Sequence, residues 1–451
     1  MTERSPSLNL LIHTALLACD SAHYRHPWDR DPEDGSLSRI LARALAAEDS
    51  GFDGVFFGDA PALLRDTLAS NGTFPYEPFT LLSALAARTS RLGLIATIPT
   101  QYNDPYNLAR RIASLDYISE GRAAWNAVTG FLGETNFGFK EIVPPSERYR
   151  RAEEFVDVVL QLWQSWKPGY LRPDAATHQY YDAEKIQDIH FHGQYFDVEQ
   201  ASTIPPSAQG RPVIVQAGAS ENGLELAGRF GELIYVATPT LEEARGYTAT
   251  YRAKAASYGR SADSVKVVPG LFAYVGATFE EALEHRASTV TDEDLLVQGI
   301  ASAKREYSGF SFDGLSLDDE LKPEQLPTER EIDQSARRRS RARLFLGFAT
   351  RPGATLRSLL TEIVTGTGHT NIVGSYDQVA DELERWYRAG AADGFVLMGT
   401  NSLDAFLAEV VPRLERKGIY DRRPGLTTFR SRLGLPEVPV VTESLAAVAG
   451  A

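Results

Sequence analysis

The feature that most constrains this chain is a regular alternation of helical and strand patterns along nearly its whole length. Apolar residues recur at helical spacing from Leu37 to Leu45, Gly51 follows as a left-handed stop, and an apolar run comes next. This order of helix, turn and buried strand then repeats. With the N-terminal run counted first, the sequence holds eight strand candidates: LNLLIHT, FDGVFFGD, RLGLIATI, GRAAWNAV, PVIVQAG, ELIYVAT, VKVVPGLFAYVG and DGFVLMG.

These runs are apolar on both faces and are linked by helical stretches, including one from Leu241 and a long helix expected from Thr278. Strands of this kind need a parallel sheet that is covered on both sides. Eight of them predict an α/β fold, a closed (β/α)8 TIM barrel. A doubly wound open sheet would produce a similar pattern and is the alternative.

Two intervals break the repeat. Residues 167–211 are rich in Pro, Tyr and His and contain an expected hairpin at DIHFHGQYFDV, whereas residues 307–371 are rich in charge, Gly and Pro. Such long stretches within a compact domain are usually lids or binding loops. We therefore predict one barrel domain over residues 1–451 with both intervals as insertions. The basic run Arg337–Arg343 is expected to be a solvated helix face, with anion binding as the alternative.

Net charge and cysteine content indicate which partners and which cellular compartment to expect. The chain has 46 Lys and Arg against 60 Asp and Glu, a net charge of −14, so nucleic acid and anionic membrane surfaces are not expected partners. The single cysteine, Cys19, cannot form an internal disulfide, which favours the cytoplasm. We expect the apolar run Leu8–Cys19 to hold the first strand. An export signal is the alternative, but Glu3 before the run and Asn9 and His13 within it disfavour that alternative.

The residues that end the strand candidates are poor in ionisable groups, although the active site of a barrel lies at these carboxyl ends. They are His13, Asp59, Thr97, Asn126–Thr129, Gly218–Ser220, Thr238, Gly276 and Gly399. Only Asp59 could serve as a glycosidase carboxylate, and only His13 and Asp59 could bind a metal. His190 and His192 share one face of the expected hairpin, but no third ligand stands at a metal-site spacing. Neither a glycosidase nor a metal site is predicted.

The segment Gly218–Asn222 follows a strand and opens a helix. It resembles the turn that carries a hydrolase nucleophile, but Asn222 stands where the second glycine is required. Ser220 is instead expected to cap the helix while its hydroxyl and the free amides behind it meet a phosphate group. A cap that touches no ligand is the alternative for Ser220, and also for Asp59.

Few acids and bases but several aromatic residues, namely Phe56, Phe57 and Trp125, stand near the strand ends. This composition favours a bound organic cofactor that supplies the difficult chemistry. No GxGxxG segment follows a strand, so a dinucleotide held by a Rossmann fold is not supported.

Six segments, in the right order, resemble one known family. They are EPFTLLSALAARTSRLGL, YNLARRIASLDYISEGRAAWNAVTG, TNFGF, RYRRAEEFVDVVLQLWQSW, PVIVQAGASENG and VADELERWYRAGAADGFVL. They are similar to the nitrilotriacetate, dibenzothiophene sulfone and pristinamycin monooxygenases, a branch of the bacterial luciferase-like superfamily. The resemblance covers the chain from about Leu8 to Leu435. It implies reduced FMN from a separate NAD(P)H-dependent flavin reductase, O2 activated as a flavin hydroperoxide, a small organic substrate and a homo-oligomer.

The resemblance also implies roles for individual residues. Those matched to FMN contacts are Asp59, Thr97, Asn126, Thr129, Tyr149 and Ser220. His13 and Asn126 are the expected catalytic residues, His13 because it ends a strand rather than because of the resemblance. His26 and His369 are further acid–base candidates that no spacing argument selects. Two departures from the family pattern are Pro145, where His is common, and Tyr24–Pro27, where a Trp-Arg start is usual. There are two alternatives for the function: a deazaflavin-dependent oxidoreductase of the same superfamily, and a flavin-binding protein without turnover. Residues 307–371 are expected to close over the site as a lid.

Overall fold

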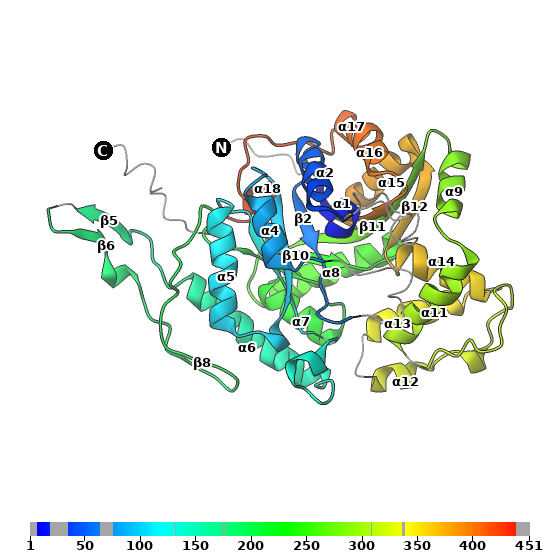
Figure 1. Cartoon of the computed structure of the whole chain (residues 1–451), viewed down its shortest axis with the longest axis horizontal. Helices are drawn as coiled ribbons and strands as arrows, with labels where there is room; N and C mark the ends of the chain where they lie inside the picture. The colour runs from blue at the N-terminus through cyan, green and yellow to red at the C-terminus, as the bar shows by residue number, and fades with distance from the viewer. Residues whose placement is uncertain are drawn as a thin grey trace.

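Eight parallel strands close into a barrel, as the sequence predicted (Figure 1). The computed structural model describes residues 7–18, 35–63, 75–130, 132–174, 176–307, 309–335 and 339–438. In their order around the barrel the strands are β1 (Asn9–His13), β2 (Gly54–Phe57), β3 (Gly93–Pro99), β4 (Ala123–Val128), β9 (Val213–Gln216), β10 (Leu233–Val236), β11 (Lys266–Gly276) and β13 (Gly394–Thr400). Strand β13 pairs with β1 and completes the ring, so the open-sheet alternative is wrong.

Helices between the strands cover the barrel and bury their apolar faces against it. They are α1 (Thr14–Ala18), α2 (Leu37–Asp49), α4 (Pro78–Ala86), α5 (Pro105–Ile118), α6 (Pro145–Trp163), α7 (Glu221–Phe230), α8 (Leu241–Ser257), α9 (Phe279–Ser288), α15 (Tyr376–Arg388), α16 (Leu403–Ala405) and α17 (Val411–Arg416). The predicted left-handed stop after α2 is confirmed, because Gly51 has a φ of 88°. None of the helices in the described ranges combines the length and the apolarity needed to cross a membrane.

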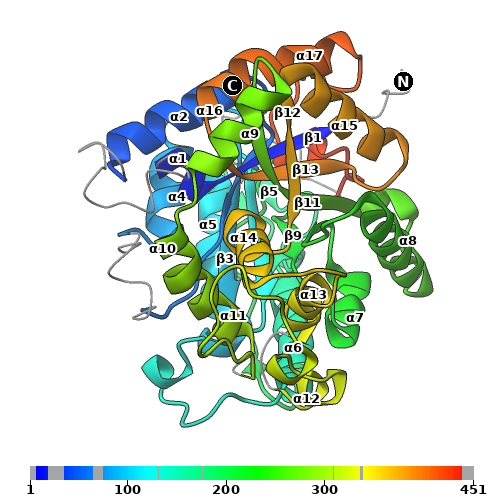
Figure 2. The ribbon, with the colours of Figure 1, turned by 90° about the vertical axis from the view of Figure 1, so that its right-hand side faces the viewer.

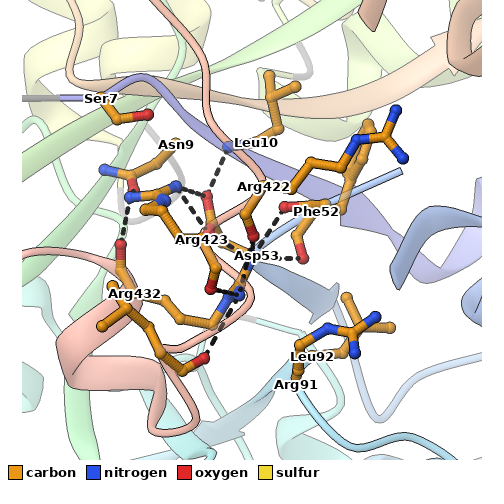
Figure 3. Close-up of polar contacts among 12 residues, drawn as sticks. Ser7, Asn9, Leu10, Phe52, Asp53, Arg91, Leu92, Arg422, Arg423 and Arg432 are labelled. Carbon is orange, nitrogen blue, oxygen red and sulfur yellow. Dashed lines mark hydrogen bonds and ion pairs between the residues drawn. The ribbon is translucent and has the colours of Figure 1, made fainter. Parts of the chain in front are cut away.

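The last helix, α18 (Phe429–Arg432), closes the amino end of the barrel. Phe429 lies so close to β3 that a Cβ atom on Gly93 would be 2.1 Å from its ring. Beside it, the buried carboxylate of Asp53 accepts hydrogen bonds from the Leu10 amide at 3.0 Å and from Arg423 Nη2 at 2.8 Å (Figure 3). Arg432 Nη2 lies 3.0 Å from the same carboxylate. The segment that carries α18 therefore holds together the end of the barrel opposite the expected site.

Residues 167–211 form two hairpins that project from the barrel (Figure 1). The predicted hairpin is confirmed as β7 (Phe191–His192) and β8 (Asp197–Val198), which are antiparallel. A hairpin of β5 (Leu171–Asp174) and β6 (Gln179–Tyr181) was not predicted. Its rings pack on Trp166, with centroid distances of 5.0 Å to Tyr170 and 5.5 Å to Tyr181.

Residues 307–371 contain more regular structure than the sequence indicated. They include α12 (Glu329–Gln334), α13 (Arg339–Ala349) and α14 (Leu356–Gly366), and with α11 (Ile300–Glu306) they enclose a separate apolar core (Figure 2). The prediction of a solvated basic face is correct for exposed Arg343, which pairs with Glu329 and Asp333. The prediction is wrong for Arg341, which is half-buried and directed at the barrel, 3.4 Å from His369.

Two further expectations need correction. The long helix from Thr278 ends at Ser288, and Thr291 then begins a new helix, α10 (Asp292–Asp294), through a capping box. A ninth strand, β12 (Thr370–Ser375), pairs with the second half of β11 and was not predicted. The remaining short elements are 3-10 turns at Thr100–Tyr102, Glu134–Phe137, Ala183–Lys185, Ala262–Ser264 and Pro323–Gln325 and π-helical turns at Leu295–Gly299 and Phe406–Val410.

The run Leu8–Cys19 contains the predicted first strand at Asn9–His13, but it turns into α1 at Thr14. Cys19 itself and the segment Tyr24–Pro27, which includes His26, lie outside the described residues.

Candidate active site

The inward-facing side chains of the barrel become accessible toward the carboxyl ends of the strands. Four inward positions are fully buried in the inner core, namely Leu11, Val215, Leu233 and Val396. Two residues further along the same strands, Ala217 is exposed and three side chains are half-buried: His13, Tyr235 and Met398. We call this end of the barrel the mouth. In Figure 1 it faces α12, whereas α18 lies at the opposite end.

His13 ends β1 and stands at the mouth as a neutral imidazole. Its Nδ1 atom accepts a hydrogen bond from the Ala15 amide at 3.2 Å, so the proton of the neutral ring is on Nε2. Burial lowers the pKa of His13 to about 4. The Nε2 atom faces Gly58, where an added Cβ atom would lie only 2.7 Å away, and Phe56 stacks on the ring at a centroid distance of 6.2 Å. At neutral pH His13 is thus a hydrogen-bond donor rather than a cation.

Asn126 and Thr97 meet across β3 and β4. Asn126 Nδ2 donates to Thr97 Oγ1 at 3.0 Å, and both residues are buried. Asn126 Oδ1 is also buried and has no hydrogen-bond partner within the described part of the chain. A buried acceptor of this kind costs stability until a donor reaches it, so the atom is suited to a ligand.

Tyr149 and Ser220, which are far apart in sequence, come together at the start of α7. Ser220 is the N-cap residue, as predicted, and its Oγ atom accepts a hydrogen bond from the Gly223 amide at 3.2 Å. The same hydroxyl lies 3.4 Å from the Tyr149 hydroxyl. The backbone segments at Gly218 and Gly223 approach too closely to leave room for a side chain on Gly223, because a Cβ atom there would lie 2.8 Å from the carbonyl group of Gly218. Two hydroxyl groups and the free amides of a helix N-terminus therefore share one small region.

The other predicted residues of the mouth are more scattered. Asp59 follows β2, is half-buried and is hydrogen-bonded to the Ala60 amide. Burial raises its pKa, the amide opposes that rise, and the nearby Glu77 adds to it. Thr129 follows β4 and is half-buried. Within the described residues no hydrogen bond joins Asp59 or Thr129 to the groups described above, so their part in a common site stays a prediction.

Two of the aromatic residues that suggested a cofactor do not face the mouth. Phe57 and Trp125 belong to the outer core between the barrel and its helices, and the Trp125 ring donates to the Ile98 carbonyl at 3.0 Å. Only Phe56 points into the inner core. Successive strand residues face opposite sides, so Phe56 and Phe57 could not both line the barrel.

Sequence reasoning missed Tyr235 and Met398. The Tyr235 hydroxyl lies 3.0 Å from His369 Nε2 and 3.1 Å from Met398 Sδ. A signal was present, because Tyr235 stands two residues after inward-facing Leu233 in an otherwise apolar strand. His369, which was named only as an acid–base candidate, is therefore part of the mouth.

Two other features lie outside the mouth. His190 and His192 on the β7–β8 hairpin pair with Glu199 and Asp197 and are exposed, which fits the expected solvated face. Within the described ranges no group of three or more His, Cys, Asp or Glu residues is arranged to hold a metal ion. A surface groove of about 310 Å³ between α4 and α5 is lined by none of the predicted site residues.

Comparisons with known proteins agree on one family. A family model described as luciferase-like monooxygenase matches residues 21–393. The N-acetyl-S-(2-succino)cysteine monooxygenase of Bacillus subtilis is 33% identical over 98% of this chain and 99% of its own. Component A of nitrilotriacetate monooxygenase from Aminobacter aminovorans is 37% identical over 80% of this chain and 79% of its own. The solved EDTA monooxygenase from Chelativorans superposes with a TM-score of 0.78 at 28% identity, covering 95% of this chain and 98% of its own.

Proposed function

We propose, from the premise that the chain belongs to the luciferase-like monooxygenase family, that it oxygenates a small organic substrate with reduced FMN and O2. Family membership confirms the resemblance noted in the sequence and makes the chain a flavin-dependent monooxygenase. The finer parts remain our proposal. They are the reduced state of the flavin, its supply by a separate NAD(P)H-dependent reductase, and a homo-oligomer of single-domain barrels whose residues 307–371 act as a lid.

The observation that carries the proposal is the convergence of Tyr149 and Ser220 at the N-terminus of α7. Free amides and two hydroxyls, beside a glycine backbone that admits no Cβ atom, suit the FMN phosphate. In addition, Asn126 Oδ1, which has no hydrogen-bond partner within the described residues, suits a donor of the cofactor. Asp59, Thr97 and Thr129 complete the proposed FMN contacts. The residues present therefore fit the cofactor.

Bound FMN would supply the oxygen chemistry, and the protein would bind, orient and exclude water. In this proposal neutral His13 donates a hydrogen bond from Nε2, and Asn126 orients the reacting groups. Pro145 provides no polar contact where relatives often carry His. It is the first residue of α6, a position that proline favours, so it fits the helix start.

The names of relatives leave the substrate open. Several denote carboxylate-rich molecules, such as nitrilotriacetate and EDTA. Others denote dimethyl sulfide and long-chain alkanes, which carry no charge.

The test is a substitution at Ser220, read as affinity for reduced FMN from tryptophan fluorescence under anaerobic conditions. Ser220→Ala should weaken binding roughly tenfold, given about 1.5 kcal/mol for a hydrogen bond to a charged group. Turnover at saturating flavin should persist. Ser220→Asp should bind flavin more weakly still, because a carboxylate repels the phosphate.

The matched control is Thr278→Ala. Thr278 caps α9 in the same way, with its hydroxyl 3.1 Å from the Glu281 amide. Both alanine variants should lose about 1 kcal/mol of stability, the usual cost of a lost cap. Only the Ser220 variants should lose flavin affinity. Unchanged affinity in Ser220→Asp would refute the phosphate assignment, and loss of turnover at every flavin concentration in Ser220→Ala would indicate a nucleophilic serine.

A further inference from the structure

Residues 167–200, which we call the arm, project from the barrel as the β5–β6 and β7–β8 hairpins (Figure 1). An isolated two-stranded hairpin is at best marginally stable in water. In β6 the side chains of Tyr180 and Tyr181 are 44% and 41% exposed, and their rings meet at a centroid distance of 4.8 Å. Exposed aromatic side chains on a projecting element are typical of a surface that a second protein covers.

The exposed apolar surface continues from the arm onto the end of α5. Tyr117 and Ile118, the last two residues of this helix, are 43% and 54% exposed. Burial raises the pKa of Tyr170, in the arm, and the neighbouring phenols of Tyr117 and Tyr181 raise it further. The end of α5 therefore lies beside the rings of the arm. Ile118 also lines the groove between α4 and α5, so the arm and the groove belong to one surface.

The groove combines apolar side chains with two cations. Its lining includes Phe79 and Ile204 and the exposed guanidiniums of Arg110 and Arg111. Arg110 Nε donates to Thr203 Oγ1 at 3.2 Å, and Arg111 lies over the Phe79 ring at 3.7 Å from its centroid. Within the described ranges neither guanidinium pairs with a carboxylate. The groove therefore offers two positive charges beside an apolar surface.

The arm carries the opposite charge. Its residues include six Asp and Glu against three Lys and Arg. Two of the acids, Asp182 and Glu184, follow directly after the exposed ring of Tyr181. Asp182 accepts the Glu184 amide at 3.1 Å, and Glu184 is exposed. Among the described residues no ion pair joins either acid to a Lys or an Arg, those of the groove included. An arm of this composition complements the groove in charge and in apolar character.

A second copy of the chain is the occupant that fits both halves of this surface. The arm and the groove lie side by side on one chain, so a two-fold rotation brings each arm to the groove of the other copy. Such a contact is self-complementary and closed, which is the commonest arrangement in homo-oligomers. A different protein would have to supply both a cationic groove and an acidic aromatic element, whereas a second copy supplies both.

We infer that two copies of this chain pair about a two-fold axis, with the arm of each lying in the α4–α5 groove of the other. Tyr180 and Tyr181 contribute apolar contact area, and the acids that follow them pair with Arg110 and Arg111. The inference rests on the proposed function, since it assigns a surface to the homo-oligomer proposed there. The groove is lined by none of the proposed site residues, so this pairing leaves the mouth open.

The test reverses the charges and measures self-association of the full chain by sedimentation equilibrium. The wild type should be a dimer or a multiple of it. Arg110→Glu/Arg111→Glu should weaken dimerisation about a hundredfold, because like charges then face each other. Asp182→Arg/Glu184→Arg should do the same from the other side. The chain that carries all four changes should regain most of the affinity, since the charges are opposite again.

Two further variants complete the test. Tyr180→Ser/Tyr181→Ser should weaken dimerisation about tenfold by removing apolar contact area. Arg245→Glu/Arg416→Glu, at two exposed arginines on α8 and α17, changes the net charge as much as the groove variant does and should dimerise like the wild type. Circular dichroism and the melting temperature, recorded on every variant, show that each one folds.

A monomeric wild type would overturn the inference, as would unchanged dimerisation in either reversed variant or a failure of the four changes to restore it. Reduced-FMN affinity, measured on the same samples, separates the two proposals. If flavin does not bind while dimerisation depends on the arm and the groove, the flavin part of the proposed function fails alone. If flavin binds and the reversed variants dimerise like the wild type, only the assigned interface fails.

Discussion

Replacing His13 by glutamine should remove a measurable part of the acid sensitivity of the fold. Burial lowers the pKa of His13 to about 4, against an ordinary value of 6.5. Because the folded-state pKa is depressed, the contribution to stability is fully present above pH 6.5 and is lost as the pH falls from 6.5 to 4. At about pH 5 the wild type should have lost about 2 kcal/mol through this residue alone. The half-exposed ring makes that figure an upper bound.

Urea unfolding at about pH 8 and about pH 5 measures this difference. Glutamine keeps an N–H donor near the position of Nε2 but does not titrate, so His13→Gln should lose less stability on acidification than the wild type. All other titrating groups are common to both proteins and cancel in the comparison. If the two proteins lose equal stability, the imidazole is charged readily in the fold, and our description of His13 as a neutral donor is refuted.

Two further predictions concern the amino end of the barrel. Asp53→Asn should lower the free energy of unfolding in urea by about 3–5 kcal/mol, because it removes the negative charge that pairs with two buried guanidiniums. The control Asp49→Asn changes an exposed carboxylate 3.7 Å from Arg91 and should alter the free energy of unfolding by less than about 1 kcal/mol. Equal losses would contradict the role of the buried pair. Gly93→Ala should lower the free energy of unfolding by about 1–3 kcal/mol, because the added methyl group clashes with the Phe429 ring. Phe429→Leu should cost less stability in the Gly93→Ala background than in the wild type. If the two effects are strictly additive, this contact does not limit stability.

The barrel itself could be predicted because each strand is apolar and bounded by turn residues, so the hydrophobic pattern identified all eight. The carboxyl-end rule then selected His13, Thr97, Asn126 and Ser220, and the structure pairs Asn126 with Thr97 and Ser220 with Tyr149. Strand β12 was missed because it follows α14 closely and begins at the very end of a charged and Gly-rich interval. Its partner is the second half of β11, more than ninety residues away in the sequence, and the local sequence pattern does not predict a pairing over that distance.

Residues 307–371 were misjudged for a related reason. Their helices bury apolar side chains such as Phe345 and Leu360 against one another rather than against the barrel. High charge concealed this separate core. Within the basic run, charge alone could not distinguish Arg341 from Arg343, because the difference lies in which tertiary neighbour each one meets.

Three acidic residues at the amino end of the barrel share one structural role, which a search confined to the carboxyl ends of the strands could not find. Asp53, Glu232 and Asp393 each stand one residue before a barrel strand begins. Each accepts the amide of a residue on a neighbouring strand: Leu10 at 3.0 Å, Ile214 at 3.0 Å and Val267 at 2.8 Å. Each also pairs with at least one arginine. A carboxylate in this place ties two strands and a guanidinium together, so the three acids stabilise the barrel at the end where no chemistry is proposed.

The two ends of the barrel therefore differ in charge. At the amino end the guanidiniums of Arg211 and Arg430 help hold the pKa of buried Glu232 down to about 2, against the opposing effect of burial, so this carboxylate stays ionised through ordinary acid conditions. At the mouth, His13 and Asn126 are neutral at physiological pH. Charges placed at the amino end contribute to stability without repelling an anionic cofactor at the mouth. Beside these neutral groups the mouth holds the acid Asp59, whose pKa is raised by burial. Groups of this kind leave the oxygen chemistry to whatever binds there.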